Sequence, residues 1–307
     1  MKKRNLILTA ALFAMTASLT ACGGQKPADP QPAADTEAQA KSEEPKEETK
    51  EEQKAEETAA VSAEKTRYEK ILESGVLKVG TEGTYKPFTY HDDNNELCGY
   101  DVEVAKAIGE KMGVKTEFSE ITWEGLLTSL DTGTVDLVLN QVGVTDERKE
   151  KYDFSDPYLY SYIALITKTD NSDITDWDSA SGKKTSLNVS SNYALIAEKY
   201  NMDITASDTF SKDIELLLAG RTDCVINNTI AFNDFLTQKP DTPIRIAAVQ
   251  EQADTVAVPI PKGNDDLVAA VNKAIAELKA DGTLTELSNK YLGKDFSKEL
   301  TLEEIQQ

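Results

Sequence analysis

Histidine and cysteine are scarce in this 307-residue sequence, which has one histidine, His91, and three cysteines. A lone imidazole, with no cluster of cysteines or carboxylates at ligand spacing around it, argues against a metal site and against a Ser-His-Asp triad. Positive charge is also in deficit, because the formal net charge is -21. Such a chain would repel phosphates. We therefore expect no metal, no cofactor and no nucleic-acid partner.

Two of the cysteines, Cys98 and Cys224, lie far from the N-terminal segment. Cys98 falls in an expected turn and Cys224 in an expected buried strand. We expect both thiols to be unpaired. A bridge between them stays open as the alternative, because the sequence alone does not give the separation of their Cα atoms.

The one long apolar run, 6–19, is too short for a comfortable membrane span. It follows the basic start Met1-Lys2-Lys3-Arg4 and is closed by Leu19-Thr20-Ala21-Cys22, which is the pattern of a secretory signal. The closing residues resemble the lipobox of bacterial lipoproteins, in which the cysteine is diacylated and becomes the mature N-terminus. We predict a signal peptide over 1–22, lipidation of Cys22 and an extracytoplasmic protein that its lipid anchors to the cell membrane. The alternative is a plain secreted protein with a free Cys22.

Residues 23–65 have almost no side chains to bury. Three prolines, Pro30, Pro32 and Pro45, stand among alanine, glutamine and a stretch, 41–57, that is rich in glutamate and lysine. Low hydrophobicity with a high density of charge leaves the entropy cost of ordering uncompensated. The sequence therefore predicts a disordered acidic tether that holds a folded domain away from the membrane.

From residue 71 onward, short apolar runs typical of strands alternate with amphipathic patterns typical of helices. The βαβαβ order predicts a parallel sheet with helices on its faces, and the pattern then starts again. The expected strands are 76–79, 115–118, 136–139, 184–187, one near 204, 223–226 and 244–249. The expected helices are 101–112, 125–130, 193–200, 213–219, 230–236, 265–280 and 284–291.

Two extended segments, 158–168 and 255–259, separate the two α/β units. We interpret them as crossings of a hinge between two lobes, each a mainly parallel sheet flanked by helices. Lobe 1 is expected to contain 66–166 and 255–297, lobe 2 to contain 167–254, and 298–307 to form a C-terminal tail.

Polar residues follow the expected strand 136–139, and one arginine, Arg148, comes soon after them. The carboxyl end of a strand is where an α/β sheet normally places its ligand. The guanidinium offers a planar fork that matches a carboxylate, and the loop 140–147 presents backbone N–H and C=O groups. This combination can hold an amino acid by its main-chain groups. The alternative is an ordinary surface arginine in a loop.

Several motifs occur in the same order as in one known family. The stretch 99–105, Gly-Tyr-Asp-Val-Glu-Val-Ala, resembles the signature of the family 3 solute-binding proteins, which are polar amino-acid receptors of ABC importers. The stretches 140–148 and 152–158, together with Ser190-Ser191-Asn192-Tyr193, resemble the cystine-binding branch of that family. The resemblance covers 77–293 and implies a two-lobed, type II periplasmic-binding-protein-like fold.

The resemblance also implies a ligand site at the cleft. Arg148 would pair with the ligand α-carboxylate, and the backbone N–H groups of Ser191 and Asn192 would add donors from the other lobe. Tyr85 and Trp123 would sandwich the ligand side chain, whereas Phe88 is expected to pack in the lobe core. The full set of expected ligand-binding residues is Glu82, Tyr85, Trp123, Asn140, Gln141, Val142, Gly143, Arg148, Ser190, Ser191, Asn192 and Asn228.

The chain departs from the family pattern at two of these positions. Gly143 replaces a hydroxyl residue that is common in the family, so that only backbone contact is expected there. Asn228 stands where relatives usually carry the aspartate that meets the ligand α-ammonium. An amide cannot neutralise an ammonium, and we expect Glu82 to supply the missing negative charge.

These observations predict a monomeric, lipid-anchored receptor that captures an L-amino acid and delivers it to an ABC permease in the membrane. L-Cystine is the favoured ligand, and cysteine and glutamine are alternatives. A dehydratase-like enzyme on the same fold is the alternative from another class, but the sequence has no histidine or carboxylate pair expected at the cleft. A sensor or adhesin domain with the same ligand would differ only in its partner.

Overall fold

The computed structural model of the chain describes residues 64–306. The predicted signal peptide, the lipidation site Cys22 and almost all of the predicted tether lie outside the described residues. Within the described part, no helix has the length and apolar character needed to span a membrane.

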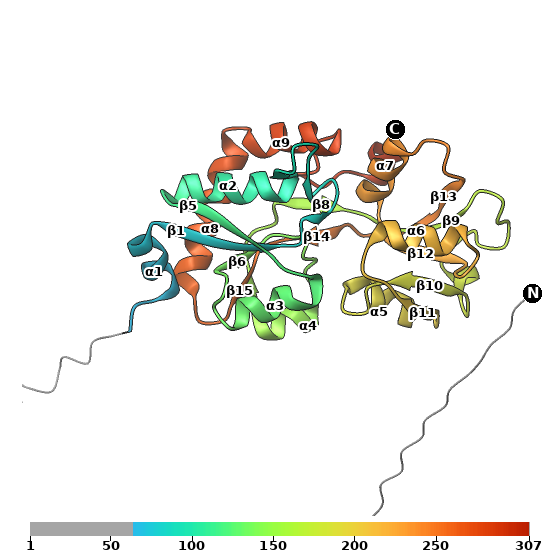
Figure 1. Cartoon of the computed structure of the whole chain (residues 1–307), viewed down its shortest axis with the longest axis horizontal. Helices are drawn as coiled ribbons and strands as arrows, with labels where there is room; N and C mark the ends of the chain where they lie inside the picture. The colour runs from blue at the N-terminus through green and yellow to red at the C-terminus, as the bar shows by residue number, and fades with distance from the viewer. Residues whose placement is uncertain (1–63, 307) are drawn as a thin grey trace, which may run out of the picture. The chain divides into compact units, whose positions relative to one another are not determined.

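The first lobe is built on a parallel sheet with strand order β5-β1-β6. Its strands are β1 (Val76–Thr81), β5 (Lys115–Glu120) and β6 (Leu137–Val138). In Figure 1, α2 (Tyr100–Met112) and α9 (Thr283–Leu292) lie on one face of this sheet, and α3 (Trp123–Asp131) lies on the other.

The alternation of β1 explains this layering. Leu77 and Val79 are fully buried in the core that α2 and α8 (Asp265–Ala280) cover. On the opposite face, a Cβ at Gly80 would lie 3.2 Å from Leu126 of α3. The close approach of α3 therefore depends on a residue without a side chain. Phe88 is fully buried in the core of this lobe, as predicted.

The second lobe has a five-stranded sheet with the order β11-β10-β12-β9-β13. Three strands, β10 (Lys184–Leu187), β11 (Asp203–Ala206) and β12 (Cys224–Asn228), are parallel. The other two, β9 (Ile163–Lys168) and β13 (Ile244–Val249), are antiparallel to their neighbours. The sheet is therefore mixed. The segment interpreted as a crossing continues into β9, which runs against the other strands, whereas those strands share one direction. Its flanking helices are α5 (Asn192–Lys199), α6 (Phe210–Leu218) and α7 (Thr229–Gln238).

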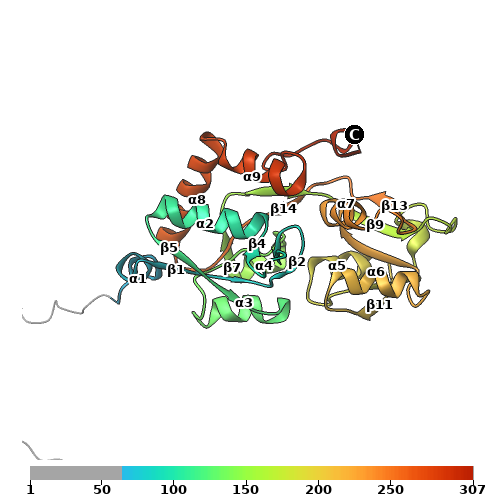
Figure 2. The same ribbon diagram turned by 45° about the horizontal axis from the view of Figure 1, so that its top comes forward.

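Two chain segments connect the sheets, as predicted. The strands β8 (Leu159–Ser161) and β14 (Asp254–Val256) pair with each other in antiparallel register, and they lie between the two sheets (Figure 2). A second pair, β7 (Tyr152–Phe154) and β15 (Pro259–Pro261), lies beside them in the first lobe. Because all of β9 belongs to the second sheet, that sheet begins at Ile163, before the limit predicted at 166.

Some short elements are absent from the prediction. The helix α1 (Arg67–Ser74) begins with a capping box between Thr66 and Glu69, and α4 (Asp146–Lys151) is capped by Thr145. The small sheet of β2 (Thr84–Tyr85), β3 (Thr89–His91) and β4 (Leu97–Cys98) also was not predicted. The tail contains α10 (Leu302–Gln306). Both described cysteines are free, as expected.

Candidate functional site

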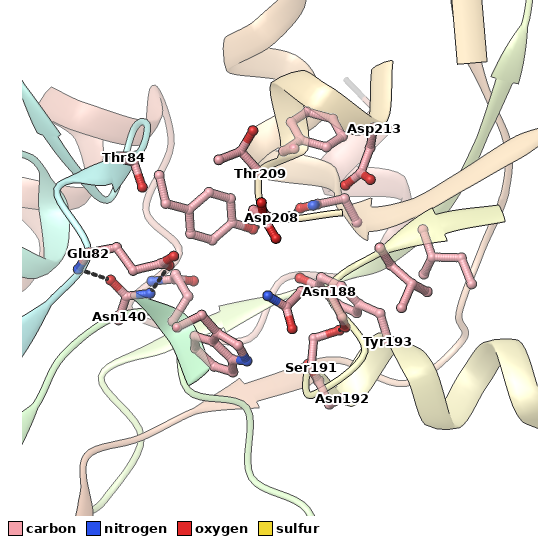
Figure 3. Close-up of a pocket in the computed structure, with 17 residues that line it drawn as sticks. Glu82, Thr84, Asn140, Asn188, Ser191, Asn192, Tyr193, Asp208, Thr209 and Asp213 are labelled. Carbon is pink, nitrogen blue, oxygen red and sulfur yellow. Dashed lines mark hydrogen bonds between the residues drawn. The ribbon is translucent and has the colours of Figure 1, made fainter. Parts of the chain in front are cut away.

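A cavity with an empty volume of about 630 Å³, counted to its open mouth, lies between the two lobes (Figure 3). The first lobe contributes Glu82, Thr84, Tyr85, Trp123, Asn140 and Gln141. The second lobe contributes Leu187, Asn188, Ser191, Asn192, Tyr193, Asp208, Thr209, Phe210, Asp213, Ile226 and Asn227. Most of these residues stand at or just beyond the carboxyl ends of parallel strands, where the topology places ligands.

Glu82 is fixed at the end of β1 by Asn140, the second residue after the end of the neighbouring strand β6. Asn140 Nδ2 donates to Glu82 Oε2 at 2.6 Å, and the Glu82 backbone N–H donates to Asn140 Oδ1 at 2.8 Å. Burial raises the pKa of Glu82 above its ordinary value, and the hydrogen bond from Asn140 acts in the opposite direction. Glu82 is therefore a positioned carboxylate at the cavity wall.

Gln141 adopts a left-handed backbone with a φ of 54°. Its backbone N–H and its Nε2 donate to the two oxygens of Asp101 at 2.7 and 2.8 Å. Asp101 is fully buried, and burial raises its pKa to about 7. The Asp101 carboxylate therefore holds the loop after β6 in a conformation that few non-glycine residues adopt.

Arg148 lies in α4, packed beside Trp123. Its guanidinium carbon is 5.4 Å from the centre of the Trp123 ring. Two of its N–H groups donate to backbone oxygens, to Gly143 O at 2.8 Å and to Ser190 O at 3.4 Å. Arg148 is 9% exposed, and burial lowers its pKa. It therefore joins the two lobes next to the cavity but does not form part of the cavity wall.

Asp254, in the connecting strand β14, lies beside this arginine and was not predicted. Asn192 Nδ2 is 3.3 and 3.4 Å from its two oxygens. Burial raises the pKa of Asp254 to about 6, while Asn192 and the charge of Arg148 lower it. A Cβ at Gly143 would lie 2.7 Å from Asn192 Nδ2 and 3.0 Å from Asp254 Oδ1. The space next to Gly143 is therefore filled by these two side chains.

A network of amides and tyrosines connects the lobes on the other side of the cavity. Tyr85 donates from its hydroxyl to Asn227 Oδ1 at 2.8 Å. Asn228 Nδ2 donates to the hydroxyl oxygens of Tyr85 at 3.0 Å and Tyr193 at 3.4 Å. Asn228 Oδ1 accepts from the backbone N–H of Ala231 at 2.7 Å and thereby caps α7. The amide of Asn228 is therefore engaged on both sides, and its neighbour Asn227 lines the cavity instead.

The structure thus brings seven of the twelve predicted site residues into one cavity wall: Glu82, Tyr85, Trp123, Asn140, Gln141, Ser191 and Asn192. The other five are placed outside the wall: Val142, Gly143, Arg148, Ser190 and Asn228. Of the second-lobe wall, Asn188 follows β10 and Asp208 follows β11. The rule that polar residues after a parallel strand mark a site, applied to these strands, would have found both. Within the described residues, no group of three or more His, Cys, Asp or Glu side chains is placed to hold a metal ion.

The model of the bacterial extracellular solute-binding proteins, family 3, matches residues 77–294. The chain is 38% identical over 232 residues to the L-cystine-binding protein TcyA of Bacillus subtilis, covering 75% of this chain and 86% of the relative. It is 38% identical over 240 residues to the L-cystine-binding protein TcyJ of Escherichia coli, covering 77% and 90%.

Solved structures agree with this assignment. The unliganded, open L-cystine solute receptor of Neisseria gonorrhoeae is similar with a TM-score of 0.56 and 38% identity, over 76% of this chain and 100% of the receptor. An ancestral arginine-binding protein bound to arginine has a TM-score of 0.67 and 33% identity, over 71% and 99%. The relatives TcyA and TcyJ are binding proteins, and the chain belongs with them to the bacterial extracellular solute-binding proteins, family 3.

Proposed function

We propose that the protein is the substrate-binding component of an amino-acid ABC importer and that its ligand is L-cystine. The main support is a polar cavity walled by both lobes, in a chain 38% identical to two L-cystine-binding proteins over most of its length. A ligand that contacts both walls favours the closed arrangement over any other, which is how a two-lobed receptor retains its ligand.

In the proposed complex, the ligand α-carboxylate lies near Arg148, which keeps N–H groups beyond the two that donate to Gly143 and Ser190. The backbone N–H of Asn192, the first residue of α5, adds a donor from the second lobe, whereas the N–H of the N-cap Ser191 already donates to Asn188 O at 3.0 Å. The guanidinium lies beside Trp123, which lines the cavity, with its carbon 5.4 Å from the centre of the Trp123 ring.

The remaining proposed contacts come from the first lobe. Tyr85 and Trp123 pack against the ligand side chain, and Glu82 accepts the α-ammonium. Asn140, Gln141, Val142 and Gly143 form the loop that supports this end of the ligand. A carboxylate at this point offsets the free-energy cost of desolvating the ligand ammonium. The amide of Asn228 leaves that cost uncompensated, because it carries no charge.

We also propose that Cys22 carries the lipid anchor, that residues 23–65 act as a tether, and that the protein works as a monomer with a membrane permease. The basic start, the apolar run and the lipobox-like residues of the sequence support the anchor. Metabolic labelling with a radioactive or clickable palmitate tests it. Loss of the label in Cys22→Ala, with the labelled band present in the wild type, is the expected result.

Calorimetric titration of the purified protein with L-cystine, L-cysteine, L-glutamine and L-arginine tests the ligand. We expect binding of L-cystine, and we expect it to disappear when a reductant converts cystine to cysteine. A Cys98→Ser variant controls for mixed disulfides, because the thiol of Cys98 is free and partly exposed. Binding of another amino acid without binding of cystine would show that the ligand is wrong and would leave the family assignment intact.

A further inference from the structure

The second-lobe wall of the cavity carries two carboxylates that none of the ligand contacts proposed above uses. Asp208 follows β11, and Asp213 lies in the first turn of α6. Both line the cavity, and Figure 3 shows Asp213 across the cavity from Glu82, with Asp208 projecting into the space between them. Glu82 and Asp213 therefore stand on opposite sides of the same cavity, with Asp208 between them.

Asp213 is buried without a cation. Only 4% of the residue is exposed, and its Oδ1 has no hydrogen-bond partner among the described residues. The nearby Lys212 pairs instead with Glu215 on the surface of α6. The residues that line the cavity, within the described part of the chain, include no lysine, arginine or histidine. A buried carboxylate in this situation is costly to keep unless something compensates its charge.

Groups within the protein compensate it only in part. The hydroxyls of Ser207 and Ser186 lower the pKa of Asp213, but burial outweighs them and raises it to about 6. The N-terminus of α6 adds a favourable dipole. Even so, the pKa remains above its ordinary value, so the folded protein holds this charge at a net cost. Residues kept at a cost to the folded state are characteristic of binding sites.

We propose that Asp208 and Asp213 form a second cation site, which takes the distal ammonium of a ligand with an amino group at each end. This inference rests on the proposed function and deepens it. Cystine has two ammonium groups, and Glu82 is the proposed partner of only one. A ligand with a single ammonium, such as cysteine or glutamine, leaves Asp213 buried and unpaired, and it is rejected for that reason.

Two mixed disulfides separate the distal ammonium from the distal carboxylate. The disulfide of L-cysteine with cysteamine is cystine without one carboxyl group. The disulfide of L-cysteine with 3-mercaptopropionate is cystine without one amino group. In titrations of the wild-type protein, we expect the cysteamine compound to bind within a few-fold of cystine and the mercaptopropionate compound to bind at least tenfold more weakly.

The variant Asp213→Asn tests the residue. We expect it to weaken the binding of cystine and of the cysteamine compound by about tenfold or more, and to change the binding of the mercaptopropionate compound by less than threefold. Asp241→Asn, in an exposed turn, is the control for the same change in net charge. The melting temperature of the ligand-free Asp213→Asn protein at pH 7.5 should be unchanged or higher, because the variant removes a buried, unpaired charge.

Equal weakening of all three ligands by Asp213→Asn, or a lower melting temperature with no change in ligand preference, would mean that Asp213 has a structural role, and the proposed site would be wrong. Tight binding of the mercaptopropionate compound to the wild type would also overturn it. Failure of cystine to bind would refute the proposed ligand separately. In that case the pair L-arginine and L-citrulline, which differ in distal charge, decides whether Asp213 selects a cation.

Discussion

Replacing Glu82 by glutamine removes the carboxylate that we expect to hold the ligand α-ammonium. In the wild type, Asn140 donates to Glu82 Oε2 at 2.6 Å. Glutamine keeps one oxygen for that contact and then turns its NH2 group toward the cavity, where an ammonium requires an acceptor. A hydrogen bond to a charged group contributes about 1.5–3 kcal/mol. We therefore expect Glu82→Gln to weaken binding by more than about 1.5 kcal/mol, which is a factor of roughly ten or more.

Calorimetric titration of the wild type and of Glu82→Gln with L-cystine measures this loss. Glu117→Gln, at an exposed residue of the same lobe that pairs with Lys115, controls for the change in net charge. Because burial raises the pKa of Glu82, wild-type affinity should fall as the pH is lowered, and the affinity of Glu82→Gln should depend less on pH. Wild-type affinity in Glu82→Gln would mean that another group holds the ammonium.

The double variant with Asn228→Asp sharpens the test. A second carboxylate near the cavity should restore part of the lost affinity. The coupling is the difference between the effect of Asn228→Asp in the Glu82→Gln protein and its effect in the wild type. The structure limits how much affinity Asn228→Asp can restore. Asn228 donates to the Tyr85 hydroxyl at 3.0 Å, and that hydroxyl already donates to Asn227. A carboxylate oxygen at position 228 would face the Tyr85 oxygen with no proton between them. This contact would be repulsive, so we expect only partial rescue. Full additivity of the two single variants would refute the coupling.

Three further predictions concern the same cavity. Arg148→Met should fold, and titration should show binding weaker by about 2–5 kcal/mol, because the desolvated ligand carboxylate loses its charged partner. Arg148→Lys should recover only part of the affinity, because lysine lacks the planar fork of donors. Cystine at a hundredfold excess over its dissociation constant should stabilise the protein by about 2.7 kcal/mol in thermal or denaturant unfolding; no shift with cystine and a shift with another amino acid would contradict the ligand. The raised pKa values of Asp101, Asp213 and Asp254, about 7, 6 and 6, mean that the folded protein binds more protons than the unfolded chain between roughly pH 4 and 7. Their contribution to the free energy of unfolding should fall as the pH rises through that window, and removal of one of them by Asp213→Asn should make the measured pH dependence shallower.

Much of the fold could be predicted from periodicity, because each lobe buries one side of its elements against another layer. The limits of α8 and β13 agree with the prediction to the residue. The alternation in β1 and the apolar stripe of α2, with Val104 and Ile108 fully buried, show why the pattern works. A long amphipathic element carries many repeats of its period, and its signal is correspondingly strong.

Short elements could not be predicted in the same way. The helix α4 has six residues, and only Arg148 is buried among them, so it has no apolar period to detect. The antiparallel pairing of β9 follows from partners more than 50 residues away in the sequence. Asp254 shows the same limit at the site, because it reaches Gly143 and Asn192 through long-range pairings, of β14 with β8 and of Val256 with Gly143.

The two departures from the family pattern are best understood together with their neighbours. At Gly143, the space for a side chain is taken by Asn192 and Asp254, and a Cβ there would meet them at 2.7 and 3.0 Å. At Asn228, the amide serves as helix cap and as donor to two tyrosines. Restoring the family residue at either position therefore requires the neighbours to move as well. At both positions, the neighbouring side chains determine which residue the structure can accommodate. A family motif aligned one residue at a time therefore predicts where these residues lie better than what each side chain contacts.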